Sequence, residues 1–285
     1  VVTGASGAIG GEMTSNPKVR KLTFTGSTEI GKLLMEQCAG TVKKTSMELG
    51  GNAPFIVFND ADIDEAIDGA MASKFRNTGQ TCVCANRLLV QNNVYEEFSK
   101  KLSDAVEKMR IGDGLQGETE QGPLIDMAAV AKVEEHMEDA VAKGAKVVSG
   151  GSRHKLGGTF FQPTVLAEVK TNMKVTHEET FGPVAPLYRF ETEEQALQMA
   201  NDTEFGLAAY FYTRDIGRIW RVMEGLEYGI VGVNEGIIST EVAPFGGMKA
   251  SGIGRDGGDY SFDFYMETKN VAIALDTHPV PALGG

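Results

Sequence analysis

Short apolar stretches typical of strands alternate along this chain with longer stretches of helical periodicity, and this alternation most restricts the possible folds. Strands are expected at residues 21–25, 88–90, 147–148, 184–190, 208–212 and 230–233. Helices, in which apolar side chains recur every three or four residues, are expected near residues 63–75, 94–109, 130–141, 193–200 and 215–226. Such alternation predicts an α/β fold with a mostly parallel sheet and helices on both of its faces.

The two ends of the chain differ from this middle part. Residues 3–10 are a turn of small residues, including Gly4, that leads into a short helix. Ser27 then follows a strand-like segment and stands where it can cap a helix that contains Ile30. This repeated strand, turn and helix is typical of the edge of a nucleotide-binding fold. Near the other end, residues 265–275 alternate weakly, as an exposed strand that pairs with another subunit would.

The composition argues against several classes of function. The net charge is −12 and no basic run is present, so nucleic acid and membranes are poor candidate partners. No apolar run approaches the roughly 20 residues of a membrane span, and we recognise no signal peptide at the start. Three cysteines do not make a disulfide framework, which favours a reducing compartment and predicts a cytoplasmic protein.

A cysteine motif is the first candidate for chemistry. Cys82 and Cys84 lie in the segment NTGQTCVC at residues 77–84, which follows a predicted helix. A thiol in a glycine-containing loop is accessible to a carbonyl group and is a good nucleophile once ionised. The residues alone also allow a small buried apolar side chain, or a metal or redox pair. Because zinc needs four ligands at recognisable spacing and the histidines are scattered, no metal is expected.

A glutamate among glycines is the second candidate. Glu48 lies in the segment MELGGNAP at residues 47–54, where apolar neighbours and two glycines indicate a partly buried carboxylate. Burial raises the pKa of a carboxyl group, which suits a general base near neutral pH. In isolation, the same pattern also fits a surface glutamate that precedes a turn.

Taken together, the motifs resemble those of the aldehyde dehydrogenase superfamily in order and spacing. The resemblance covers nearly all of residues 1–275 and is carried by FTGSTEIG at 24–31, ELGG at 48–51, GQTC at 79–82, EETFGP at 178–183, and Asn234 with PFGG at 244–247 and GIGR at 252–255. It implies a parallel-sheet catalytic domain with a remnant of a Rossmann-like cofactor domain. The expected division is a partial dinucleotide-binding domain at residues 1–50, a catalytic domain at 51–250 and a C-terminal arm at 251–285.

The resemblance also implies a mechanism that uses NAD or NADP. Cys82 attacks an aldehyde carbon, hydride passes to the nicotinamide, and Glu48 activates the water that hydrolyses the resulting thioester. The positions that match the family's cofactor site are Gly26, Ser27 and Phe181 near the nicotinamide, Glu179 at a ribose hydroxyl, Gly4 and Ile30 beside the adenosine, and Leu49.

Within the superfamily, the chain most resembles succinate-semialdehyde dehydrogenase. The segments KFRNTGQTCVCANR at residues 74–87 and NEGIIS at 234–239 carry this resemblance. They imply that Arg76 and Ser239 hold the distal carboxylate of a semialdehyde, because a guanidinium pairs bidentately with a carboxylate and a hydroxyl donates one more bond. The competing interpretation of Arg76 is a solvated residue at a helix end.

Several alternatives remain within this resemblance. A glutarate-semialdehyde dehydrogenase differs by one methylene in its substrate, which is worth only about 1–3 kcal/mol of discrimination. A CoA-acylating relative generally needs no base such as Glu48, so this residue favours hydrolysis. Cys84 resembles the second cysteine of redox-regulated members and implies a reversible Cys82–Cys84 disulfide; a packed bystander is the competing interpretation.

The resemblance further implies that this chain lacks part of the family's pattern. The upstream cofactor region, with an Asn that completes the oxyanion hole and a Lys that meets the adenosine ribose, has no counterpart in these 285 residues. Loss of one oxyanion donor typically costs about 10²–10³ in rate, so we expect these residues alone to be nearly inactive or to keep only partial cofactor binding. Because the family forms dimers and tetramers through a strand like residues 265–275, a homodimer or homotetramer is expected.

Overall fold

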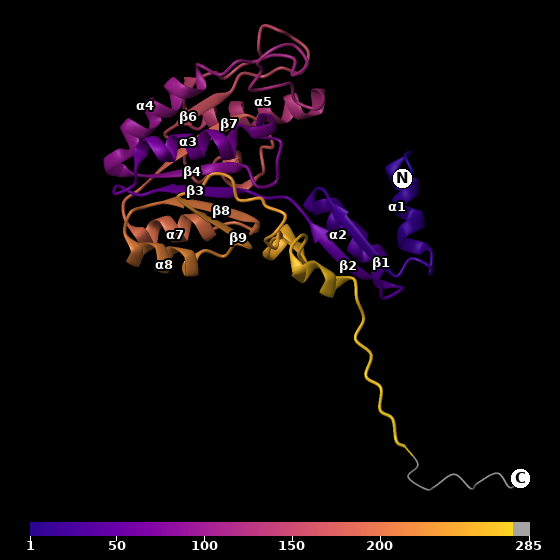
Figure 1. Ribbon diagram of the computed structural model, residues 1–285. Helices are drawn as coiled ribbons and strands as arrows, with labels where there is room; N and C mark the ends of the chain where they lie inside the picture. The colour runs from indigo at the N-terminus through magenta and orange to yellow at the C-terminus, as the bar shows by residue number, and fades with distance from the viewer. Residues whose placement is uncertain (276–285) are drawn as a thin grey trace, which may run out of the picture.

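The computed structural model describes residues 1–275, which form two sheets with helices packed against them (Figure 1). The strands of the larger sheet are β3 (Ala53–Val57), β4 (Ala85–Gln91), β5 (Lys146–Ser149), β6 (Thr164–Ala167), β7 (Val184–Phe190), β8 (Ala208–Tyr212) and β9 (Ile230–Val233). Their order is β5-β6-β7-β4-β3-β8-β9, and every neighbouring pair except β5 and β6 is parallel. The predicted α/β class with a mostly parallel sheet is confirmed.

Helices cover both faces of this sheet, as expected. They are α3 (Ile63–Lys74), α4 (Tyr95–Val106), α5 (Met127–Ala142), α6 (Lys174–His177), α7 (Glu193–Asn201) and α8 (Ile216–Gly225). In Figure 1, α3 and α4 lie above the sheet, and α7 and α8 lie below it. Successive strand residues pack on opposite faces, since Phe55 and Val57 join the core under α3 and α4 while Ile56 joins the other core. Strands buried on both faces are therefore apolar throughout.

The smaller sheet is built from both ends of the chain. The parallel strands β1 (Lys21–Thr25) and β2 (Lys44–Glu48) pair with each other, and β10 (Gly252–Ile253) joins β2 in the antiparallel direction. Two helices accompany this sheet, α1 (Ser6–Ser15) and α2 (Thr28–Ala39). The Ser27 hydroxyl accepts a hydrogen bond from the N–H of Ile30 and so caps α2, as expected. The domain division at residues 50 and 250 stays a prediction.

The remaining described elements are short. Four 3₁₀ turns are present, η1 (Arg76–Gly79), η2 (Asn92–Val94), η3 (Lys249–Ser251) and η4 (Asp259–Phe264). Beyond η4, residues 265–275 extend away from the body without forming a strand (Figure 1), and their pairing with another subunit stays a prediction. Residues 276–285 of the expected arm lie outside the described residues. Within residues 1–275, no helix is both long enough and apolar enough to span a bilayer.

Candidate active site

A cavity of about 580 Å³ brings together segments that are far apart in the sequence. It lies where β1 and β2 end, beside the loop after η1 and the loop between α6 and β7. The sequence-predicted residues in its lining are Glu48, Cys82, Gly26, Ser27, Leu49, Glu179 and Phe181. The structure therefore brings both candidate catalytic residues and most of the candidate cofactor residues to one hollow.

The loop before Cys82 turns through three consecutive residues in the left-handed region. The φ angles of Asn77, Thr78 and Gly79 are 53°, 62° and 73°. Non-glycine residues adopt this conformation at a cost, so the surrounding structure must hold it. A Cβ at Gly79 would overlap the carbonyl oxygen of Gly182, which explains the need for glycine there. The turn places the Cys82 side chain, which is partly exposed, in the cavity.

Side chains of this loop are tied to the segment that precedes α5. The Thr78 hydroxyl donates to the carbonyl of Gly122 at 3.1 Å. The Gln80 side chain accepts from the N–H of Ile125 at 2.8 Å. Because these bonds lie on the residues just before Cys82, they restrict where the thiol can move.

Glu48 ends β2 and is buried, with 5% of its surface exposed. Burial and the nearby charge of Asp256 raise the pKa of Glu48 to about 8, while Arg255 acts in the opposite direction. Its Oε2 atom is buried without a hydrogen-bond partner among the described residues. A buried carboxyl group with a pKa near neutral and a free oxygen is suited to accept a proton from water or from a thiol.

The segment after Glu48 touches the backbone of Cys82. A Cβ at Gly51 would overlap the carbonyl oxygen of Cys82, so a glycine permits this close approach. Burial and the charges of Glu179 and Glu48 raise the pKa of Cys82 to about 11. The thiol is therefore mostly protonated at neutral pH, and a base or an added positive charge in the cavity would increase the fraction of reactive thiolate.

Glu179 and Phe181 also line the cavity. Glu179 accepts a hydrogen bond from the N–H of Gly51 at 3.1 Å through Oε1. A Cβ at Gly50 would lie 3.0 Å from its Oε2, so the glycine leaves this oxygen accessible. Burial raises the pKa of Glu179 to about 7, although the hydrogen bond from Gly51 acts to lower this pKa. Phe181, 37% exposed, forms part of the wall. An accessible carboxylate oxygen and an aromatic ring are compatible with a sugar hydroxyl and a flat ring of a ligand.

Two other predicted cofactor residues line a separate hollow. Gly4 and Ile30 border a cavity of about 650 Å³ between α1 and α2. Ile30 is 45% exposed on the surface of α2. The hollow has a mostly apolar wall of small residues from α1, which is compatible with a flat base.

The predicted substrate and redox residues lie outside the main cavity lining. Arg76 is exposed at the start of η1, and Ser239 is half-buried in the loop after β9. Cys84 is buried, and its thiol lies 3.9 Å from the carbonyl oxygen of Arg76. Cys82 and Cys84 are both free in the structure. The Tyr210 hydroxyl donates to the carbonyl of Val83 at 2.7 Å, which fixes the backbone between the two cysteines.

Sequence reasoning missed several residues that line the cavity, namely Thr25, Gly50, Gln80, Thr81, Ala129, Lys132 and Thr180. Most of them are direct neighbours of predicted site residues, and this adjacency was the available signal. Ala129 and Lys132 are different, because they come from α5 and lie one helical turn apart. No motif near them indicates a site.

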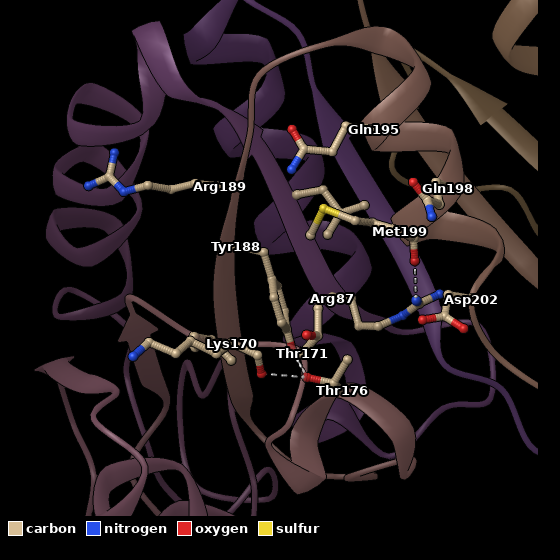
Figure 2. Close-up of a pocket in the computed structure, with 12 residues that line it drawn as sticks. Arg87, Lys170, Thr171, Thr176, Tyr188, Arg189, Gln195, Gln198, Met199 and Asp202 are labelled. Atoms are coloured by element: carbon tan, nitrogen blue, oxygen red, sulfur yellow. Dashed lines mark hydrogen bonds between the residues drawn. The ribbon is translucent and has the colours of Figure 1, made fainter.

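A further cavity of about 440 Å³ lies beside α7 and the loop after β6 (Figure 2). The Arg87 guanidinium is buried there but donates to the backbone carbonyls of Asn52, Met199 and Ala200. The Thr176 hydroxyl likewise donates to the carbonyl of Lys170. Because these polar groups are occupied by the chain itself, the cavity offers little for chemistry. Among residues 1–275, no group of three or more His, Cys, Asp or Glu is placed to hold a metal.

The structure thus combines a mostly parallel α/β sheet with a cavity that Cys82 and Glu48 share. The family model described as the aldehyde dehydrogenase family matches residues 1–271, and this chain belongs to that family.

The chain is also similar to individual members of the family. The chain is 66% identical over 275 residues to a succinate-semialdehyde dehydrogenase (NADP(+)) of Escherichia coli K12, covering 96% of this chain and 57% of the relative. It is 63% identical to a glutarate-semialdehyde dehydrogenase of Pseudomonas aeruginosa, and the match covers 96% of this chain and 56% of that relative. A crystal structure of an E. coli NADP-dependent enzyme superposes on this chain with a TM-score of 0.95 at 65% identity. The superposition covers 96% of this chain and 57% of that enzyme. The chain thus spans little more than half the length of these relatives.

Proposed function

We propose that this chain is the catalytic part of an NAD(P)-dependent enzyme that oxidises succinate semialdehyde to succinate through a cysteine thioester. The observation that carries the proposal is the shared cavity of Cys82 and Glu48, whose lining also includes Glu179 and Phe181. Two relatives named for semialdehyde oxidation, at 66% and 63% identity, support it.

The first chemical step uses the thiol. Cys82 releases its proton to solvent water, and its Sγ forms a bond to the aldehyde carbon while the carbonyl oxygen becomes an oxyanion. The backbone N–H of Cys82 stabilises that oxyanion. When bound, the oxidised nicotinamide supplies the hydride acceptor and a positive charge that offsets the two nearby carboxylates. Loss of hydride from the tetrahedral carbon re-forms the C=O bond and leaves a thioester on Cys82.

The second step uses the carboxylate. Glu48 takes a proton from water, the hydroxide adds to the thioester carbon, and the C–S bond breaks with the electron pair returning to sulfur. The products are a carboxylic acid and the free cysteine. Glu179 would accept a hydrogen bond from a ribose hydroxyl, Gly26 and Ser27 would border the nicotinamide, and Gly4 and Ile30 would border the adenosine.

We further propose that Arg76 and Ser239 hold the carboxylate of the substrate. Arg76 is exposed and lies on η1, the turn that leads directly to Cys82. Three relatives are named for substrates with an anionic end, since a 3-sulfolactaldehyde dehydrogenase of Pseudomonas putida, 61% identical, joins the two semialdehyde dehydrogenases. An exposed guanidinium is suited to such an end.

Glutarate semialdehyde is the second candidate substrate, because a relative named for it is nearly as similar as the one named for succinate semialdehyde.

The proposal includes assembly as a homodimer or homotetramer. It also includes a cytoplasmic location, which the three free cysteines support.

The proposed function is tested by NAD(P)H formation on addition of each semialdehyde, with Cys82→Ala as control. Faster turnover of the four-carbon substrate, abolished in Cys82→Ala, supports the proposal; faster turnover of the five-carbon substrate favours the second candidate. Acylation of Cys82 without NAD(P)H formation would indicate a chain that keeps only part of the cofactor site. Equal NAD(P)H formation with and without the thiol would overturn the proposal.

A further inference from the structure

Helix α5 contains a buried histidine that the proposed reaction does not use. His136 is fully buried. Its Nδ1 lies 3.1 Å from the Thr180 hydroxyl, and its Nε2 lies 3.2 Å from Oε2 of Glu178. These two partners flank Glu179 in the chain. A single imidazole therefore contacts both sequence neighbours of Glu179, and the Glu179 carboxylate lines the cavity that contains Cys82 and Glu48.

The hydrogen-bond partners determine where the imidazole carries its proton. Burial lowers the pKa of His136, although Glu178 acts in the opposite direction, so the ring is neutral at neutral pH. The other charged groups that face it are Lys132, which lowers the pKa, and Glu135, which raises it. A carboxylate can only accept, so Nε2–H donates to Glu178 and Nδ1 accepts from the Thr180 hydroxyl.

Other contacts show that α5 supports this segment as a whole. A Cβ at Gly182 would overlap the side chain of Val133, so α5 packs directly against the loop one residue beyond Phe181. Phe181 has a φ of 51°, a left-handed conformation that persists only when the surroundings hold it. Thr180, 2% exposed, lies between this strained residue and Glu179.

We propose that His136 is a positioning residue for the cofactor. As a neutral imidazole protonated on Nε2, it holds Glu178 and Thr180 and thereby fixes the Glu179 carboxylate and the Phe181 ring in the cavity wall. The proposal rests on the proposed function in one respect, that the cavity takes a nicotinamide dinucleotide. It predicts that loss of the imidazole weakens cofactor binding more than it slows acylation of Cys82, which lies on a different loop.

The test compares graded variants by the Kd for NAD⁺ and NADP⁺ and by acylation of Cys82 with an activated ester. His136→Phe removes both hydrogen bonds, His136→Asn retains reach toward Thr180, His136→Gln retains reach toward Glu178, and Thr180→Val removes one bond. Each lost bond should raise Kd by about 3- to 10-fold, with His136→Phe the weakest binder. His177→Gln, at an exposed histidine beside the same segment, is the matched control and should bind like wild type.

Two readouts separate this proposal from the proposed function. In ¹⁵N-histidine NMR spectra, His136 should show the Nε2–H tautomer, and amide hydrogen exchange at residues 178–182 should accelerate in His136→Phe. An Nδ1–H tautomer, or unchanged exchange and Kd in His136→Phe, would overturn the role of His136. A wild-type chain that binds neither NAD⁺ nor NADP⁺ would instead overturn the proposed function, and the exchange of residues 178–182 would still decide whether His136 positions them.

Discussion

At the scale of single residues, the raised pKa of Glu48 makes hydrolysis of the acyl enzyme dependent on pH. A base acts only when deprotonated, so deacylation of Cys82 should speed up as pH rises through about 8, the pKa of Glu48. Single-turnover decay of an acyl group on Cys82, followed by mass spectrometry across this range, measures the effect. A decay rate that does not change with pH would contradict the role of Glu48.

The same pKa predicts a change in stability. Because the pKa of Glu48 rises from 4.5 to about 8 on folding, the folded chain keeps this proton to higher pH than the unfolded chain does. The resulting stabilisation is fully present below 4.5 and is lost as pH rises to about 8. Glu48→Gln, which cannot ionise, should therefore gain in Tm relative to wild type as pH increases. Parallel melting curves for both proteins would reveal this, and a constant difference would count against it.

Cys84 leads to a prediction about oxidation. We expect peroxide to form a Cys82–Cys84 disulfide that a thiol reverses. Burial raises the pKa of the Cys84 thiol, so the bond should form slowly and only when the loop opens. Peptide mapping should find the bridge in wild type, while Cys84→Ser should lose activity without rescue by thiol. Complete oxidation with no bridge would end the proposal.

At the scale of elements, strands with a clear pattern were predictable to the residue. Strands β1, β7, β8 and β9 have the predicted bounds, and α7 and α8 differ from theirs by single residues. Strands β2, β3 and β6 were missed. Strand β3 is apolar throughout, so it lacks the alternation that marks a half-buried strand.

The turn before Cys82 allows a matched comparison of glycine substitutions. Gly79 and Gly144 have φ angles of 73° and 99°, but a Cβ meets the Gly182 carbonyl only at Gly79 and has no neighbour at Gly144. Gly144→Ala should cost about 1–2 kcal/mol of stability from backbone conformation alone. Gly79→Ala should cost more than this and also slow acylation of Cys82. Denaturant unfolding and ester kinetics measure both effects, and equal behaviour of the two variants would show that the contact is unimportant.

At the scale of the whole molecule, the cavity is assembled from segments that only the fold brings together. The motifs identified Glu48, Cys82 and Glu179 because family resemblance marks such residues. They could not identify His136 or Lys132, since a histidine and a lysine on an amphipathic helix are unremarkable until the helix is placed against residues 178–182.

Residues 265–275, which extend away from the body of the molecule, lead to a prediction about assembly. Their apolar side chains at Val271, Ile273 and Leu275 are 65–82% exposed and alternate along the chain. If they pair with a second subunit, Ile273→Asp should shift the molecule to a monomer, because a charge would be buried at the interface. Ala272→Asp, on the other face of the alternation, is the control. Analytical ultracentrifugation distinguishes the species, and a wild-type monomer would refute the predicted assembly.

The most direct test of a shared Cys82 and Glu48 site is the fate of an acyl group that needs no cofactor. Wild type, Glu48→Gln and Cys82→Ala would each be mixed with p-nitrophenyl acetate and followed by intact mass and peptide mapping. Glu48→Gln should accumulate a single acetyl group on Cys82, wild type should release it about 10²–10⁴ times faster, and Cys82→Ala should acquire none. Equal release by wild type and Glu48→Gln, or acetylation at another cysteine, would contradict a glutamate base acting on a Cys82 thioester.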